Sequence, residues 1–171
     1  MRHHPFSTLA IGALAFGSAC ASQPRPTIRA ADIERIQCDS TSTSRDDLVR
    51  SIAVLRVRPM FTHMRSNTSG EDRVNGVMLL VRPPGGVSAE QLTRILQCHG
   101  ARALLGQLDG DSVQNDPYWL PDTWVAIDVK AEDGNFAVTL TTDTVRDNLR
   151  VFGRANRYAD EHALANGSGL P

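Results

Sequence analysis

The sequence has almost no net charge, because 18 Lys and Arg residues balance 19 Asp and Glu residues to leave a formal charge of -1. A field of one sign strong enough to attract nucleic acid or an anionic membrane surface is therefore excluded. Lys130 is the single lysine, and the arginines are spread along the chain. We expect no nucleic-acid partner, and the hydrophobic content of 41%, before glycine is counted, predicts an ordinary globular domain.

The sequence also lacks the spacings of common redox, haem and zinc sites. It contains 3 cysteines but no C-x-x-C or C-x-x-C-H motif, which excludes a thioredoxin-type dithiol and covalently attached haem. No Cys and His pair has the spacing of a structural zinc site. We therefore predict no cofactor.

The one long apolar run lies at the start of the chain. Residues 1–19 begin with a weakly basic stretch at Arg2 and continue with apolar residues 9–16, which is typical of a secretory signal peptide. The run is shorter than the roughly 20 apolar residues that a membrane span needs. We therefore expect export, with no membrane span of the protein's own.

A lipid anchor is predicted at Cys20. The segment Gly17-Ser18-Ala19-Cys20 resembles the bacterial lipobox, in which small residues precede a cysteine that is acylated and becomes the new N-terminus. The family has Leu, Val or Ile where this chain has Gly17. The alternative is cleavage at the A-x-A site Ala19-Cys20-Ala21, which would leave a soluble periplasmic or secreted protein that begins at Ser22.

Two further cysteines, Cys38 and Cys98, make a candidate disulfide. An even pair in an oxidising compartment suits one bridge. It would close a loop of about 60 residues and stabilise the fold by roughly 4 kcal/mol.

Composition and periodicity divide the rest of the chain. Proline and serine in residues 20–47 predict a tether, residues 48–160 the folded domain, and residues 161–171 a flexible tail. Within the domain, alternating apolar residues predict strands and a 3.6-residue period predicts helices. The expected order is strand 53–58, strand 76–82, helix 88–105, strand 125–130, strand 136–140 and a helix that begins at a Thr142 or Asp143 cap.

This order predicts an α+β fold. We expect a two-layer sandwich in which two helices cover one face of a mostly antiparallel four-stranded sheet, ferredoxin-like in general kind. Residues 66–74 are polar and are expected to form a loop. The order in which the strands pair stays open.

His99 is the residue that most invites a chemical interpretation. It shares one face of the first helix with Leu92, Leu96 and Ala103, so we predict a buried, neutral imidazole whose pKa lies below the usual value of about 6.5. The alternative is a copper site in the exported protein. Its candidate ligands are Cys98, His99, Met60, His63 and Met64. An extended chain would point His63 away from the two methionines, which argues against this site.

A small hydrolase is the other alternative. Cys98 and His99 are adjacent, but neighbouring residues on a helix diverge by about 100° and cannot form the hydrogen bond that activates a thiolate. Acidic pairs such as Asp46-Asp47 are expected to be solvated in loops. We therefore expect no catalytic residue.

Aromatic side chains are few, at 5%, yet Tyr118, Trp119 and Trp124 lie within seven residues. They form a candidate contact loop that could stack on a sugar ring or touch a partner. The alternative is a loop that folds back and closes the end of the core.

Three segments carry a resemblance to a family: Cys98-His99-Gly100-Ala101-Arg102, Asp116-Pro117-Tyr118-Trp119-Leu120-Pro121 and Gly134-Asn135-Phe136-Ala137-Val138. The chain resembles uncharacterised envelope lipoproteins of GC-rich Gram-negative bacteria over roughly Val74 to Arg157. The resemblance implies a place in the cell envelope and no known activity. We therefore expect an envelope interaction module, tethered to a membrane by its lipid anchor, that contacts protein or cell-wall partners.

Overall fold

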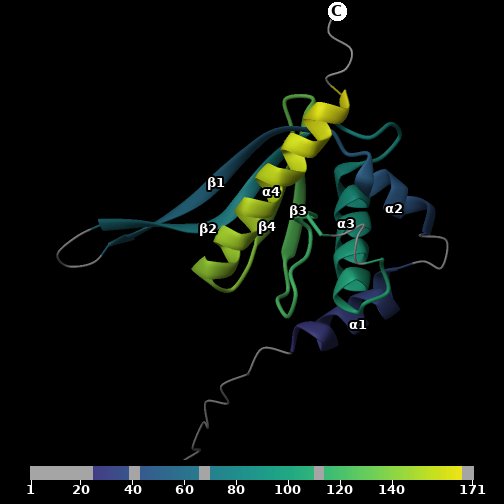
Figure 1. Cartoon of the computed structure of the whole chain (residues 1–171), viewed down its shortest axis with the longest axis horizontal. Coiled ribbons are helices and arrows are strands. Elements are labelled where there is room, and N and C mark those ends of the chain that lie inside the picture. Colours follow the sequence, from purple (N-terminus) through teal and green to yellow (C-terminus); the bar gives the residue numbers. More distant parts are fainter. Residues whose placement is uncertain (1–24, 39–42, 66–69, 110–113, 167–171) are drawn as a thin grey trace, which may run out of the picture.

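The computed structural model describes residues 25–38, 43–65, 70–109 and 114–166 (Figure 1). The predicted signal peptide and Cys20 lie outside this part of the chain. The elements are, in order, α1 (Pro26–Gln37), α2 (Thr43–Arg50), β1 (Val54–Arg65), β2 (Gly70–Val81), α3 (Ala89–Leu104), β3 (Ala126–Glu132), β4 (Asn135–Thr141) and α4 (Val145–Asn166). Among the described residues, no helix combines the length and the apolar character that a membrane span requires.

The four strands form one sheet in the order β1-β2-β4-β3, and every neighbouring pair is antiparallel. The predicted α+β class and four-stranded sheet are confirmed. After α1 and α2, the chain continues as two successive β-β-α units, whereas a ferredoxin-like chain places a helix after its first strand. Strands β2 and β4 meet at the centre, and β1 and β3 form the two edges.

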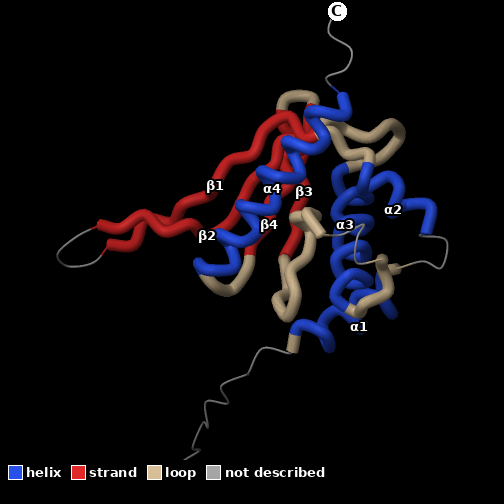
Figure 2. Tube along the Cα trace, in the orientation of Figure 1, coloured by secondary structure: helices blue, strands red, loops and turns tan. Residues whose placement is uncertain are grey.

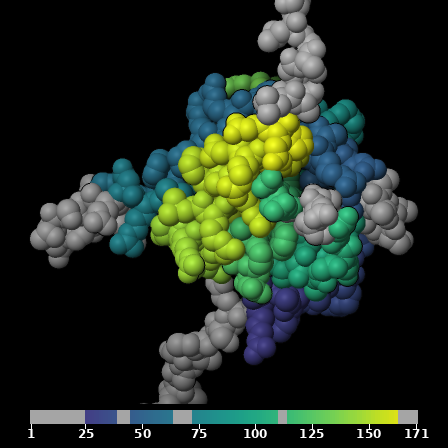
Figure 3. Space-filling view, in the orientation of Figure 1, coloured from purple at the N-terminus to yellow at the C-terminus, as the bar shows by residue number. Residues whose placement is uncertain are grey.

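Each main helix packs against strands of the other unit. Helix α3, which follows β2, contacts β3, while α4, which follows β4, contacts β2 and β1 (Figures 1 and 2). Their apolar faces meet the sheet in one core, which includes Leu79, Leu96, Val138 and Val151, all fully buried. Figure 3 shows α4, in yellow, on this face of the molecule.

The ends of α3 follow from local sequence. Ser88 followed three residues later by Gln91 predicts a capping box, and the structure contains it. The Ser88 hydroxyl accepts the backbone N–H of Gln91, and the Gln91 side chain accepts the backbone N–H of Ser88. At the other end Gly106 has a φ of +70°, a left-handed conformation that glycine adopts without strain. All four residues predicted to face the core from this helix are buried.

Helix α4 differs from the prediction in its start and its buried face. It begins at Val145, after the Thr144 hydroxyl accepts the backbone N–H of Asp147. The 3.6-residue spacing of Val145, Leu149 and Phe152 predicts that they face the core, but Val145 and Leu149 are 40% and 50% exposed. The buried side chains are Asn148, Val151, Ala155 and Tyr158. The helix also continues to Asn166, into the segment predicted to be a flexible tail.

Proline lacks the N–H that a central strand would use, so Pro59 predicts either the end of a strand or an edge position. It lies within β1, which is an edge strand. The β1–β2 hairpin is longer than predicted, since β2 begins at Gly70, inside the expected loop 66–74. β2 pairs with β4 only from Val77 to Val81. The outer part of the hairpin therefore projects from the sheet as a two-stranded ribbon (Figure 2).

The expected tether 20–47 contains two helices in its described part. Helix α1 packs against α3, on the side away from α4 (Figure 1). Ala30 of α1, Ala101 of α3 and Trp124 form a small second core. The tether interpretation failed because α1 buries a single small residue, which leaves no apolar period in the sequence to detect.

Candidate functional site

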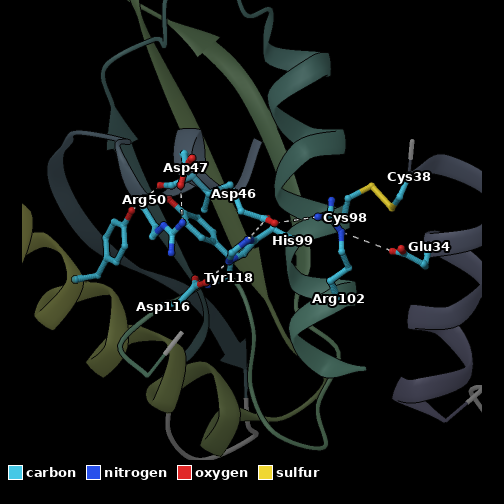
Figure 4. Close-up of polar contacts among 12 residues, drawn as sticks. Glu34, Cys38, Asp46, Asp47, Arg50, Cys98, His99, Arg102, Asp116 and Tyr118 are labelled. Atoms are coloured by element: carbon cyan, nitrogen blue, oxygen red, sulfur yellow. Dashed lines mark hydrogen bonds and ion pairs between the residues drawn. A yellow bond between two sulfur atoms is a disulfide. The ribbon is translucent and has the colours of Figure 1, made fainter. Parts of the chain in front are cut away.

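His99 lies on α3 between two carboxylates (Figure 4). Its ring donates from Nδ1 to Asp46 Oδ1 of α2 at 2.8 Å and from Nε2 to Asp116 Oδ2 at 2.5 Å. The histidine is only 3% exposed. Gly100 permits this arrangement, because a Cβ at that position would lie 2.7 Å from the carbonyl oxygen of Tyr118. The Asp116–Tyr118 segment can thus approach the helix closely.

The predicted burial of His99 is confirmed, but its predicted neutrality is wrong. Burial alone lowers the pKa of an imidazole, yet the hydrogen bonds to Asp116 and Asp46 outweigh that penalty and raise the pKa of His99 to about 9. Burial raises the pKa of Asp46, but the hydrogen bond to His99 and the charge of Arg102 lower it by more than burial raises it. The pKa of Asp46 therefore lies below its usual value. His99 is therefore a buried imidazolium.

The charges continue from His99 to α1. Arg102 donates from Nη1 to Asp46 Oδ2 at 2.9 Å, and its Nε lies 3.8 Å from Glu34 Oε2. Asp46 was expected in a solvated loop, but its side chain is 13% exposed because it balances two buried cations. We call Glu34, Asp46, His99, Arg102 and Asp116 the ionic cluster. It joins α1, α2, α3 and the segment before β3, which is a structural role.

The disulfide between Cys38 and Cys98 is confirmed (Figure 4). It spans 60 residues, with the two Cα atoms 5.7 Å apart, and fastens the end of α1 to α3. The Cys98 sulfur is bonded to Cys38 and cannot act as a thiolate. Because both nitrogens of His99 are bonded as well, the neighbours considered for hydrolysis have neither a free thiol nor a free base.

The copper candidates that the structure describes lie on two elements, Met60 and His63 on β1 and Cys98 and His99 on α3. His63 lies on the projecting ribbon, where it is exposed and bonds Asp72 at 2.8 Å. Met60 is half-buried on the same strand, and the Met64 side chain lies outside the described part. The described residues contain no group of three or more His, Cys, Asp or Glu side chains arranged to hold a metal ion.

The predicted aromatic contact loop is wrong for two of its three residues. Tyr118 is 1% exposed and packs edge-on against Tyr158, with ring centroids 5.9 Å apart. Trp124 is 9% exposed beneath the Arg29 guanidinium. Trp119 is half-buried against Arg154. The alternative, a loop that closes the end of the core, holds because the chain has few other large side chains for that purpose.

Sequence reasoning missed a groove along α3. It has a volume of about 1020 Å³ and runs between α3 and the edge strand β3, with the end of α1 and the start of α2 beyond the helix. Ile95, Cys98 and Val129 are buried and form its floor. The buried Arg102 also lines the cavity. Other polar and charged side chains form its rim: Gln37, Arg45, Glu90, Gln91, Thr93, Arg94, Gln97, Asp128 and Lys130. We call this cavity the α3–β3 groove.

The rim charges are mostly paired. Arg94 lies 2.6 Å from Glu90, and Lys130 lies 3.5 Å from Asp128. Arg45 has no ion-pair or hydrogen-bond partner among the described residues. Among the described residues, Arg45 is therefore the groove's one cation without a partner, and it lies above an apolar floor.

Comparisons with known proteins add no assignment. No protein-family model matches the chain, and neither the curated proteins nor the solved structures gave a significant match.

Proposed function

We propose that the protein is an exported binding module of the cell envelope, anchored by a lipid on Cys20, and that it holds a protein or cell-wall partner in the α3–β3 groove. The groove carries this proposal, since about 1020 Å³ of open volume is ample for several side chains of a partner.

The arrangement of the walls supports a binding role. The disulfide fastens α1 to α3, and the ionic cluster fastens α2 to α3. A groove whose walls are held in place before binding loses less conformational entropy when a partner enters. The rigid framework therefore favours recognition over a merely structural role for this surface.

Several features of the chain support export. The apolar start of the sequence is typical of a signal peptide, and the lipobox resemblance ends at Cys20. The Cys38–Cys98 disulfide is of the kind that persists in oxidising compartments. The resemblance to envelope lipoproteins points to the same location.

Mass spectrometry of the protein purified from a Gram-negative membrane tests the anchor. We expect an N-terminus at Cys20 that carries acyl chains. An unmodified N-terminus at Ser22 would contradict the anchor and leave export intact, whereas a protein that retains Met1 in the cytoplasm would contradict both.

Photo-crosslinking in living cells tests the groove. A photo-reactive phenylalanine analogue in place of Thr93, which is half-buried in the groove, should yield a discrete adduct. The same substitution at Arg146, exposed on α4 and outside the groove, is the matched control. An adduct at Arg146 with none at Thr93 would contradict the proposal.

A further inference from the structure

The outer edge of β3 forms one wall of the groove. The β3–β4 hairpin turns at Asp133-Gly134, two residues with positive φ, and pairs Glu132 with Asn135. In a hairpin with a two-residue loop, the flanking pair exchanges both backbone hydrogen bonds. Hydrogen-bonded and non-hydrogen-bonded pairs alternate along an antiparallel ladder, so Lys130 also bonds β4. The backbone N–H and C=O groups of Ile127, Val129 and Ala131 therefore face outward.

Three residues of β3 thus present their N–H and C=O groups at the edge. Gln97 of α3 donates from Nε2 to the carbonyl of Ile127 at 3.1 Å, which confirms the outward direction. Val129 and Ala131 follow at the same spacing, and no described residue bonds them from outside the sheet. Both line the groove. The groove therefore contains unpaired strand backbone beside a helix.

Such an edge is suited to an extended chain. A peptide that runs between an edge strand and a helix gains main-chain hydrogen bonds from the strand and places alternate side chains toward the helix. Here those side chains would reach the apolar floor at Ile95 and the aliphatic wall of Ile36 and Ala89. A flat ligand or a helix would leave the edge groups of Val129 and Ala131 unpaired.

The charge of the groove selects the peptide. Because Arg45 has no partner among the described residues, it can bond a carboxylate without breaking an existing ion pair. We propose that an extended peptide with acidic side chains adds to β3 as a fifth strand of the four-stranded sheet. This inference rests on the proposed function and names the partner class of the same groove.

An extended peptide with the repeat Thr-Val-Thr-Glu, which places valine and glutamate on the same face of the strand, is the direct probe. Labelled with fluorescein, it should bind the full-length protein at low ionic strength about tenfold more tightly than the valine and lysine counterpart. Strand addition uses amides of one edge of the peptide. We therefore expect a contrast between two peptides, one N-methylated at its odd-numbered amides and the other at its even-numbered amides. One of them should lose binding and the other should retain it.

Two substitutions in the protein locate the contact. Ala131→Pro removes the outward N–H and leaves the ladder to β4 intact, so affinity for the glutamate peptide should fall about tenfold or more. Ala131→Val retains the N–H and should bind as the parent does. Arg45→Gln should abolish the preference for glutamate over lysine, while Arg146→Gln should preserve it.

The outcomes separate the two proposals. Equal loss of binding in both N-methyl series, or no loss in either, would overturn strand addition, as would unchanged affinity in a folded Ala131→Pro protein. A crosslink from Thr93 would then still support a groove-binding partner of another shape. The parent protein could instead form a dimer in which two β3 edges pair. If Ala131→Pro then had half the solution mass of the parent, the edge would belong to a second copy and the peptide proposal would be overturned.

Discussion

At the scale of the residue, His99 holds a charge in a buried site because each ring nitrogen faces a carboxylate oxygen. The sequence places it on the core face of a helix, and that position alone suggests a neutral ring. Asp46 and Asp116 are 53 and 17 residues away along the chain. No local pattern links these residues, so the sign of the pKa shift could not be predicted.

The raised pKa of His99 predicts a loss of stability in alkali. The unfolded imidazole has a pKa near 6.5 and the folded one about 9, so the proton adds up to roughly 3 kcal/mol below pH 6.5. This contribution should disappear as the pH rises through 9. Urea unfolding at pH 6 and pH 9 measures this change in the free energy of unfolding. His99→Gln should reduce the difference between the two pH values, while His63→Gln is the control that should leave the difference unchanged.

NMR titration of the ring gives the same answer site by site. A His99 that loses its proton near pH 6.5 would contradict the buried imidazolium.

The lowered pKa of Asp46 affects stability in acid. Its stabilising contribution is present above about pH 4 and is lost as the pH falls.

Two tyrosines predict opposite responses to the loss of a hydroxyl. The Tyr118 hydroxyl is buried without a hydrogen-bond partner among the described residues, so Tyr118→Phe should leave stability unchanged or slightly higher. The Tyr158 hydroxyl donates to the Val49 carbonyl at 2.8 Å, and Tyr158→Phe should cost about 1 kcal/mol. Denaturant melts of both variants compare them; equal losses would refute this distinction.

At the scale of the element, the contact between α3 and the Tyr118 segment depends on one glycine. A Cβ at position 100 would meet the Tyr118 carbonyl, so Gly100→Ala should destabilise the fold by about 1 to 3 kcal/mol. Gly153 on α4 has ordinary space around it, and Gly153→Ala should stabilise by about 0.5 to 1 kcal/mol. Thermal melts measure both variants. Changes of the same sign in the melting temperatures of Gly100→Ala and Gly153→Ala would contradict this distinction.

Local sequence predicts the elements that carry their own signals. The capping box at Ser88, the glycine after α3 and the two-residue turn at Asp133-Gly134 all stand where the sequence places them. Helix α4 shows the limit of this approach. Its apolar residues allow two overlapping faces, and the choice of Val151 over Leu149 depends on contacts with strands β1 and β2 from the other unit.

At the scale of the whole molecule, the disulfide joins the N-terminal helices to the sandwich. Replacing Cys38 and Cys98 with serine should lower the free energy of unfolding by about 4 kcal/mol. Urea unfolding of the parent in reducing buffer should show the same loss. Two titratable thiols from these positions in the denatured, unreduced protein would refute the bridge.

The groove is formed only when the elements pack together in the tertiary structure. Its walls come from α1, α2, α3 and β3, segments that are distant in sequence and carry no motif of their own. Composition and periodicity predict the walls formed by α3 and β3, but neither α1 nor α2, which begin in the expected tether, and not how the walls are placed relative to one another. The candidate site therefore depends on the tertiary structure, while the fold class does not.

Hydrogen exchange tests most directly whether a partner binds in the α3–β3 groove. Full-length protein is compared alone and in the presence of envelope extract, with exchange followed by mass spectrometry. The account predicts slower exchange within residues 89–98 and 126–132, which form the two walls. Slower exchange confined to the β1–β2 ribbon, or no change in any segment, would contradict it.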